Sequence, residues 1–229
     1  MSGRSRARAA RTGVVALAFL LAGIWLVMLM GGAGALDQQI YQALYAGRDP
    51  ALVAIARVFT FFGEPTVLII AGVVFASVMW WRGHLRTGLT LVAVTMAGRA
   101  VSELQKYEVA RVRPALEPHL VLVKTSSFPS GHSASSMIFY LTLALLLTHR
   151  GRWRHLAAAG AVLMAVLIGL SRVMLGVHWP SDVIGGWSLG MLAAGLAVEA
   201  GRRSGVSGLE PEHEIVGRHR LPVDEDQSA

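Results

Sequence analysis

The stretch Ser171-Arg172-Val-Met-Leu-Gly-Val-His178-Trp-Pro-Ser-Asp182 joins two long apolar segments of this 229-residue chain. It brings a cation, a histidine and a carboxylate into a sequence of which 54% is hydrophobic and only 15% is charged. Soluble proteins carry about 25% charged residues. The composition is therefore that of a membrane protein, and the polar stretch is a candidate functional site between two of its spans.

The apolar residues fall into six segments, some of them short, that can cross a bilayer of about 30 Å. They do not alternate with a period of two, as the strands of a membrane β-barrel would. We therefore predict an all-α fold: a polytopic membrane protein with six transmembrane helices. The predicted spans are Val14–Met30, Pro65–Trp81, Leu85–Ser102, Ala134–Thr148, Leu156–Gly176 and Val183–Ala200.

Arginine clusters predict the orientation of these spans. They precede the first span and follow the second, fourth and sixth, which places all of them on one face of a six-span protein; the positive-inside rule makes that face cytoplasmic. This topology also explains most of the net charge of +7 without nucleic acid as a partner. The clusters are Arg4, Arg6, Arg8 and Arg11; Arg82 and Arg86; Arg150, Arg152 and Arg154; and Arg202 and Arg203.

The same pattern divides the chain into regions. We predict a basic cytoplasmic N-terminus over 1–13, one membrane domain over 14–200 and a disordered cytoplasmic tail over 201–229. Within the domain, 37–62 is predicted to lie along the outer membrane surface as an interfacial segment. Ala33-Gly34-Ala35 leaves open cleavage of the first apolar segment as a signal peptide. The chain has no cysteine, which excludes disulfides and thiolate metal sites.

Two further polar stretches fall in the predicted outward connections. Lys106-Tyr-Glu-Val-Ala-Arg-Val-Arg113-Pro114 supplies two cations, and Lys106 and Lys124 are the only lysines among 21 basic residues. Arginine forks match phosphate oxygens in pairs, and lysine adds a point charge. Lys106, Arg113 and Arg172 are thus candidates to surround one phosphate.

The stretch Pro129-Ser-Gly-His132 precedes the fourth predicted span. Gly131 lets the backbone approach a ligand, and amides at a helix start point toward anions. Ser130 adds a hydroxyl donor, and His132 is placed to protonate a leaving oxygen. In the first-quoted stretch, Pro180 predicts a helix start near Ser181. Asp182 can then bind one nitrogen of His178 and leave the other free to attack phosphorus.

Together these stretches resemble the type 2 phosphatidic acid phosphatase (PAP2) superfamily. The pattern is K-x6-R-P, then P-S-G-H, then S-R-x5-H-x3-D, and the resemblance covers roughly 14–200. The superfamily includes membrane lipid phosphatases, bacterial acid phosphatases and vanadium haloperoxidases, so the resemblance implies a PAP2/haloperoxidase-like helical bundle. All eleven fixed positions match: Lys106, Arg113, Pro114, Pro129, Ser130, Gly131, His132, Ser171, Arg172, His178 and Asp182.

The resemblance implies an integral membrane lipid phosphatase that acts through a phosphohistidine, with no metal and no cofactor. His178 would be the nucleophile, Asp182 would orient it and His132 would be the general acid and base. Lys106, Arg113, Ser130, Gly131 and Arg172 would bind the phosphate. Opposite protonation states of the two histidines predict a bell-shaped pH profile. The expected partners are the bilayer and a lipid phosphate of the inner membrane: undecaprenyl diphosphate, phosphatidic acid or phosphatidylglycerophosphate. The oligomeric state is left open.

Several alternatives stay open at this point. The phosphoryl group could pass to another acceptor, as in a phosphotransferase, or the cationic pocket could serve a non-enzymatic transporter. His132, His178 and Asp182 are also common zinc ligands, although nearby cations would repel a metal. Three further features have two interpretations each: Arg99 and Glu103 as functional charges or an ion pair, Arg111 and Lys124 as substrate-steering or solvated, and Trp179 as a membrane-interface or substrate-contacting residue.

Overall fold

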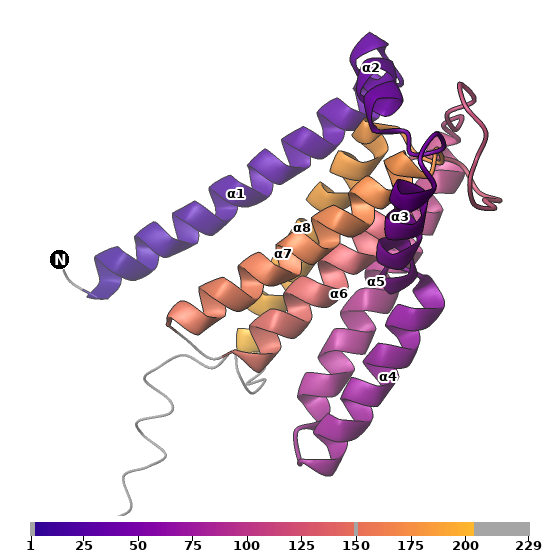
Figure 1. Cartoon of the computed structure of the whole chain (residues 1–229). Coiled ribbons are helices and arrows are strands. Elements are labelled where there is room, and N and C mark those ends of the chain that lie inside the picture. The colour runs from indigo at the N-terminus through magenta and orange to yellow at the C-terminus, as the bar shows by residue number, and fades with distance from the viewer. Residues whose placement is uncertain (1–2, 149–150, 204–229) are drawn as a thin grey trace, which may run out of the picture.

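The computed structural model describes residues 3–148 and 151–203. These residues form eight helices and no strand, which confirms the predicted all-α class (Figure 1). The predicted tail beyond Arg203 lies outside the described residues. The helices are α1 (Gly3–Gly31), α2 (Ala35–Leu44), α3 (Pro50–Phe62), α4 (Pro65–Trp81), α5 (Leu85–Val109), α6 (Gly131–Leu147), α7 (Arg152–Met174) and α8 (Pro180–Arg203).

Local sequence signals explain where several helices begin. Proline stands at the first position of α3, α4 and α8, where its missing N–H costs no helical hydrogen bond. The Asp49 carboxylate caps α3 by accepting from the amides of Ala51 at 2.8 Å and Leu52 at 3.4 Å. The start of α8 at Pro180 agrees with the predicted start near Ser181.

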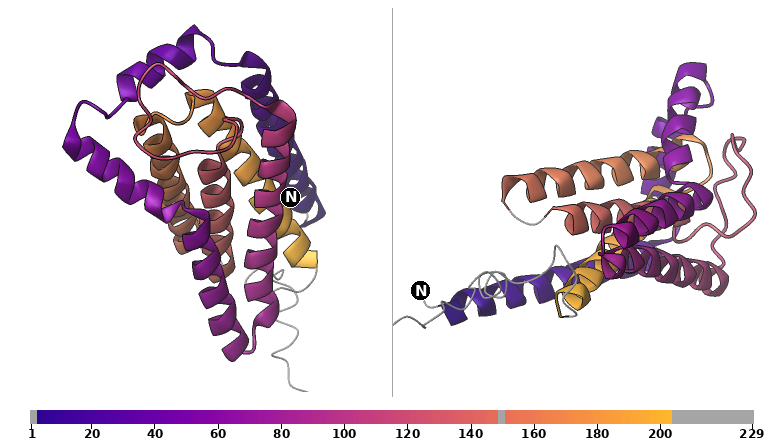
Figure 2. Two further views of the ribbon diagram at one scale, coloured as in Figure 1. Left: turned by 90° about the vertical axis from the view of Figure 1, so that its right-hand side faces the viewer. Right: turned by 90° about the horizontal axis from the view of Figure 1, so that it is seen from below.

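α6 is the central helix of the bundle, in contact with α4, α5, α7 and α8. α4 and α5 form an antiparallel pair on one side of it, and α1 packs against α8 (Figure 1). The long connection between α5 and α6 arches over one end of the bundle, and α2 and α3 lie at that same end (Figure 2). The three polar stretches of the sequence are thereby gathered at one end of the molecule.

Three described helices are long and apolar enough to cross a membrane: α1 over Thr12–Gly31, α7 over Arg152–Met174 and α8 over Pro180–Gly201. α3 and α4, bent by 43° at their junction, together form a possible fourth span. α6 is apolar but 17 residues long, and α5 carries charged residues along its length. The protein is an integral membrane protein, and the count of six spans stays a prediction.

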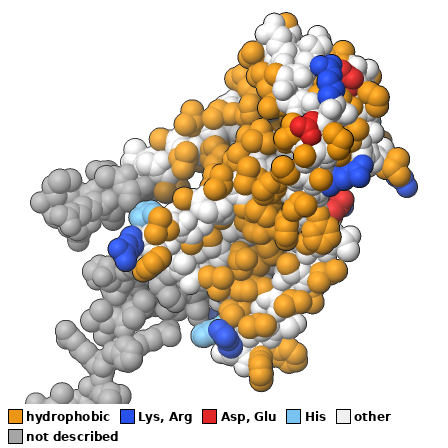
Figure 3. Space-filling model, viewed as in Figure 1, with side chains coloured by type: hydrophobic (Ala, Val, Ile, Leu, Met, Phe, Trp, Pro, Cys, Tyr) orange, Lys and Arg blue, Asp and Glu red, His pale blue; other side chains and the backbone are white. Residues whose placement is uncertain are grey.

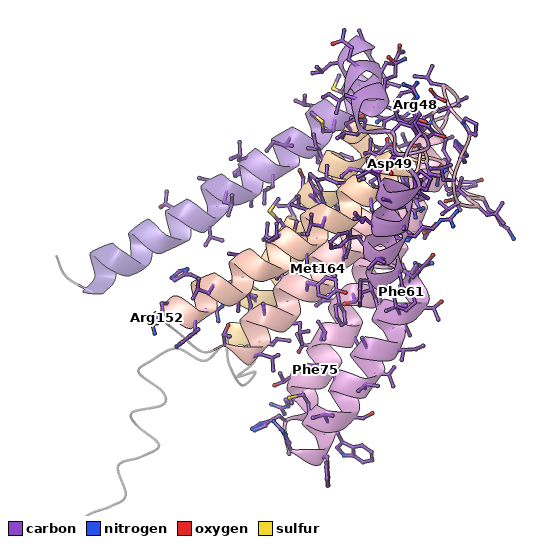
Figure 4. All side chains as sticks on the ribbon, in the orientation of Figure 1. Arg48, Asp49, Phe61, Phe75, Arg152 and Met164 are labelled. Carbon is purple, nitrogen blue, oxygen red and sulfur yellow. The ribbon has the colours of Figure 1, made fainter. Side chains whose placement is uncertain are left out.

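The outer surface fits a bilayer environment. In Figure 3, apolar side chains cover the middle of the visible face and charged side chains lie toward its two ends. Figure 4 places Arg48 and Asp49 at the end where α2 and α3 lie, and Arg152 at the opposite end.

Candidate active site

A cavity of about 290 Å³ opens at the end of the bundle beneath the α5–α6 connection. Its lining residues come from both sides of the α3–α4 junction, the end of α5, residues 121–125 of the connection, the start of α6 and the end of α7. Six of the eight predicted site residues line it: Lys106, Arg113, Gly131, His132, Arg172 and His178. The cavity is cationic. Arg99 and Lys124 line it in addition to the three predicted cations, and its lining includes only two carboxylates, those of Glu64 and Glu103.

His178 and Asp182 are paired as predicted. His178 follows α7 and is 2% exposed, and Asp182 in the first turn of α8 is fully buried. The His178 Nδ1 lies 3.4 Å from the Asp182 Oδ2. A proton on Nδ1 therefore faces the carboxylate, and the lone pair on Nε2 faces the cavity. Burial lowers the pKa of His178 to about 3, which leaves the ring neutral at physiological pH.

Three other groups hold the Asp182 carboxylate. The hydroxyl of Ser127 and the amide of Trp179, the latter at 2.9 Å, both donate to Oδ2. The Arg111 Nη1 donates to Oδ1 at 2.9 Å. Each carboxylate oxygen thus has fixed donors, so the face that Asp182 presents to His178 is set by its surroundings.

The side chain of Arg113, a residue of the α5–α6 connection, lies between Thr125 and His178. Its Nε donates to the carbonyl of Thr125 at 2.7 Å, and its Nη1 donates to the carbonyl of Val177 at 2.5 Å. The same Nη1 lies 3.2 Å from the Nε2 of His178. With the ring proton on Nδ1, this Nε2 accepts from Arg113, and a phosphate held by the guanidinium would lie beside it.

Lys106 reaches the cavity from the last turn of α5. Its Nζ lies 3.1 Å from Oε1 of Glu103 and 3.3 Å from Oγ1 of Thr125. Glu103 therefore pairs with this lysine, and no Arg99–Glu103 ion pair is formed in the described part of the chain. A Cβ on Gly131 would lie 3.1 Å from Nζ, so glycine keeps the space in front of the amine open.

Two buried nitrogens in the cavity have no hydrogen-bond partner. They are Nε of Arg172 and Nε2 of His132. The Nη1 of Arg172 donates to Thr60 at 2.6 Å. The Nε2 of His132 is 3.7 Å from Oε2 of Glu64, close enough for an ion pair but beyond hydrogen-bond length. Buried polar atoms are normally satisfied, so these two point to a ligand with acceptor oxygens.

Ser130 has a different place from the one predicted. It is fully buried and is not among the residues that line the cavity. Its Oγ accepts from the amide of Ser133 at 3.4 Å and from the hydroxyl of Ser133 at 2.9 Å, which makes it the N-cap of α6. By fixing the start of that helix, Ser130 positions Gly131 and His132 at the cavity wall.

Sequence patterns did not assign the roles of several residues that support the site. Arg111 is neither solvated nor at the cavity wall, and its side chain is 9% exposed. Trp179 is 6% exposed and donates to the carbonyl of Val112 at 3.0 Å, so neither interpretation of it holds. Thr60 comes from the segment 37–62, which was predicted to be interfacial, and Glu64 lies just after that segment. The Glu64-Pro65 pair, a carboxylate at the start of an apolar helix, was the available signal for that contact.

Comparison with known proteins identifies the family of this chain. The model of the PAP2 superfamily matches residues 87–205, which include all eight predicted site residues. Phosphatidylglycerophosphatase B of Bacillus subtilis (strain 168) is 33% identical over 160 residues, which are 68% of this chain and 78% of that protein. Undecaprenyl-diphosphatase of Sulfolobus acidocaldarius is 28% identical over 193 residues, 81% of this chain and 89% of that protein.

A solved structure agrees with the fold. The crystal structure of a transmembrane PAP2-type phosphatidylglycerolphosphate phosphatase from Bacillus subtilis matches with a TM-score of 0.74 at 29% identity. The match covers 81% of this chain and 96% of that one. The bundle and the order of its helices are therefore those of a known membrane phosphatase structure.

Proposed function

This chain belongs to the PAP2 superfamily, whose relatives described above are lipid phosphatases, and from this membership we propose that it hydrolyses a membrane lipid phosphate through a phosphohistidine. The substrate class is a phosphate monoester or diphosphate of a lipid. Candidates are undecaprenyl diphosphate, phosphatidic acid and phosphatidylglycerophosphate, and two of these head groups occur in the names of the relatives.

One observation carries the proposal: the cavity holds a neutral, carboxylate-paired histidine together with a buried arginine, Arg172, whose Nε has no hydrogen-bond partner. The Nε2 of His178 carries a lone pair, and Nη1 of Arg113 lies 3.2 Å from it. The Nε of Arg172 is buried without a partner in the same cavity. A bound phosphoryl group would satisfy the Nε donor of Arg172 and place its phosphorus in front of the nucleophile.

The proposed reaction has two steps. In the first, Nε2 of His178 attacks phosphorus, the bond from phosphorus to the leaving oxygen breaks, and His132 donates a proton to that oxygen. In the second, His132 takes a proton from water while the water oxygen attacks phosphorus and the P–N bond breaks. Inorganic phosphate leaves and His178 is regenerated. Arg113, Arg172 and Lys106 stabilise the charge on the phosphoryl oxygens in both steps.

We further propose that the protein resides in the cytoplasmic (inner) membrane and that the cavity faces the extracytoplasmic side. The lipid tail would stay in the bilayer while the phosphate enters beneath the α5–α6 connection. The arginine-rich connections at the other end of the bundle support this orientation through the positive-inside rule.

The test is phosphate release by the purified, detergent-solubilised protein. The three candidate lipids and a water-soluble phosphomonoester are offered with EDTA present. We expect release from at least one lipid, and we expect His178→Ala to remove most of a rate enhancement of at least about a millionfold. His155→Ala is the matched control, because His155 is an exposed histidine near the opposite end of the bundle, at the start of α7.

Each outcome has a distinct meaning. Equal release by His178→Ala and the unchanged protein would overturn the phosphohistidine. Consumption of the lipid without release of free phosphate, with the phosphoryl group recovered on a second lipid, would indicate the phosphotransferase alternative. Binding of the lipids with neither product would favour the transporter.

A further inference from the structure

Arg111 is a buried cation outside the phosphate cavity, and its fork joins three parts of the molecule. Its Nη1 donates to Oδ1 of Asp182 at 2.9 Å and to the hydroxyl of Ser181 at 3.1 Å. Its Nη2 donates to two carbonyls in the last turn of α1, those of Met28 at 2.7 Å and Leu29 at 2.8 Å.

The surroundings of this guanidinium confine it further. Its carbon lies 4.4 Å from the centre of the Phe128 ring, in cation–π contact. The backbone carbonyl of Arg111 accepts from the amide of Ser127, whose hydroxyl donates to Asp182. Side chain and backbone of one residue therefore act on both oxygens of the same carboxylate, one directly and one through Ser127.

A second carboxylate extends this network. The Asp37 side chain, 8% exposed, accepts from the amide of Ser181 at 2.9 Å and from the Ser181 hydroxyl. Since Ser181 also receives the Arg111 donor, Asp37 on α2 fixes the residue adjacent to Asp182. The first turn of α8 is thus bound to α1, α2 and the α5–α6 connection.

We propose that Arg111 is a positioning residue for the reaction: it keeps Asp182 ionised and oriented so that His178 holds its proton on Nδ1 and presents Nε2 to phosphorus. This proposal rests on the proposed function. A buried carboxylate that loses its cation tends to take up a proton. A protonated Asp182 would be a poor acceptor for Nδ1–H, and His178 would lose its preferred tautomer. Lysine could keep the charge at this place but could not replace the two-sided fork.

The experiment compares Arg111→Gln, Arg111→Lys and Asp182→Asn on the lipid that the unchanged protein hydrolyses best. We expect Arg111→Gln to lower kcat about tenfold to 100-fold with little change in KM, because Arg111 does not line the cavity. The acid limb of the pH–rate profile of Arg111→Gln should move to higher pH, because Asp182 without its cation is protonated more easily. Arg111→Lys should recover part of kcat and part of that shift.

Arg111→Gln combined with Asp182→Asn should cost no more than Asp182→Asn alone, because both act through the same carboxylate. Multiplied losses, a rise in KM with unchanged kcat, or an unmoved acid limb would each overturn the proposal. Arg48→Gln is the control, since Arg48 pairs with Glu117 on the surface at the same end of the molecule. If Arg111→Gln does not fold, Ser181→Ala removes one link of the network, and it should lower kcat and shift the limb in the same direction.

A readout independent of turnover separates this inference from the proposed function. The ¹⁵N shifts of His178, assigned by difference from His178→Ala, report which ring nitrogen carries the proton. We expect the Nδ1–H form in the unchanged protein and a mixture in Arg111→Gln. If no substrate is hydrolysed but the tautomer changes in this way, the proposed function fails and the positioning role stands. An unchanged tautomer would refute the positioning role.

Discussion

The two cavity histidines differ in the carboxylate that each one faces. Burial lowers the pKa of both, to about 3 for His178 and to about 4 for His132. His178 faces Asp182, which raises its proton affinity, but burial outweighs this contact and keeps the ring a neutral nucleophile. His132 lies outside the predicted span, 3.7 Å from the half-exposed carboxylate of Glu64. Glu64 raises the proton affinity of His132, whereas Arg172 and Lys106 lower it.

These shifts define the expected pH dependence. The base must be neutral, so activity rises with pH through the pKa of His178; the acid must be protonated, so activity falls as pH rises through the pKa of His132. We therefore expect a bell-shaped kcat/KM with its maximum on the acidic side of neutrality. The alkaline limb of kcat should lie at higher pH, because a bound phosphate dianion raises the pKa of His132. A monotonic rise from pH 5 to 9 would contradict these assignments.

Glu64→Gln tests the contact between Glu64 and His132. Removing the carboxylate lowers the pKa of His132, so the alkaline limb of kcat/KM should move to lower pH, by about one unit. The measurement is a pH series of initial rates. Glu117→Gln, which removes a surface carboxylate paired with Arg48, should leave the limb in place. A limb that stays in place or moves upward in Glu64→Gln would show that Glu64 does not support the acid.

At the scale of the elements, the site depends on how closely α6 and α8 approach each other. Their contacts run along glycines on α8. A Cβ on Gly186 would lie 2.7 Å from the carbonyl of Ser130, and one on Gly190 would lie 2.6 Å from Cβ of Met137. The amide of Ser130 also donates to the carbonyl of Asp182 at 3.0 Å. The start of α6 and the start of α8 are thereby held together, and with them the two histidines.

Gly186→Ala should disturb this contact. The added methyl group meets backbone atoms of the turn that carries His132, so we expect a loss of about 1–3 kcal/mol in stability and a fall in kcat. Thermal unfolding in detergent and initial rates measure the two effects. Gly195→Ala is the matched control on the same helix, because nothing lies within 4 Å of its added Cβ. Equal behaviour of the two variants would show that α6 and α8 tolerate a wider spacing.

For the whole molecule, the main feature is that the cavity and the arginine-rich connections lie at opposite ends of the bundle. The cavity lies beneath the α5–α6 connection. At the other end, Arg82 lies in the turn between α4 and α5, Arg86 at the start of α5, and Arg152 and Arg154 at the start of α7 (Figures 1 and 4). If the arginines face the cytoplasm, the substrate must reach the site from the outer leaflet.

The absence of cysteine allows a direct test of this orientation. Leu122→Cys places a thiol on the α5–α6 connection, where Leu122 is 96% exposed, and Arg152→Cys places one at the opposite end. In intact cells, a membrane-impermeant maleimide should label Leu122→Cys only. Arg152→Cys should become labelled after the membrane is permeabilised. The reverse pattern would place the site in the cytoplasm.

The sequence was sufficient for the helical class, the start of α8, the His178–Asp182 pair and most of the residues at the cavity. Apolar composition follows from the bilayer, and a spacing of four residues brings two side chains together at the start of a helix. It was not sufficient for Arg111, Glu64 or the pair formed by Asp37 and Ser181. Those contacts join residues from 68 to 144 positions apart. They depend on how whole helices pack. A local pattern of residues indicates which side chains lie close together on one helix, but not which other helix will pack against it.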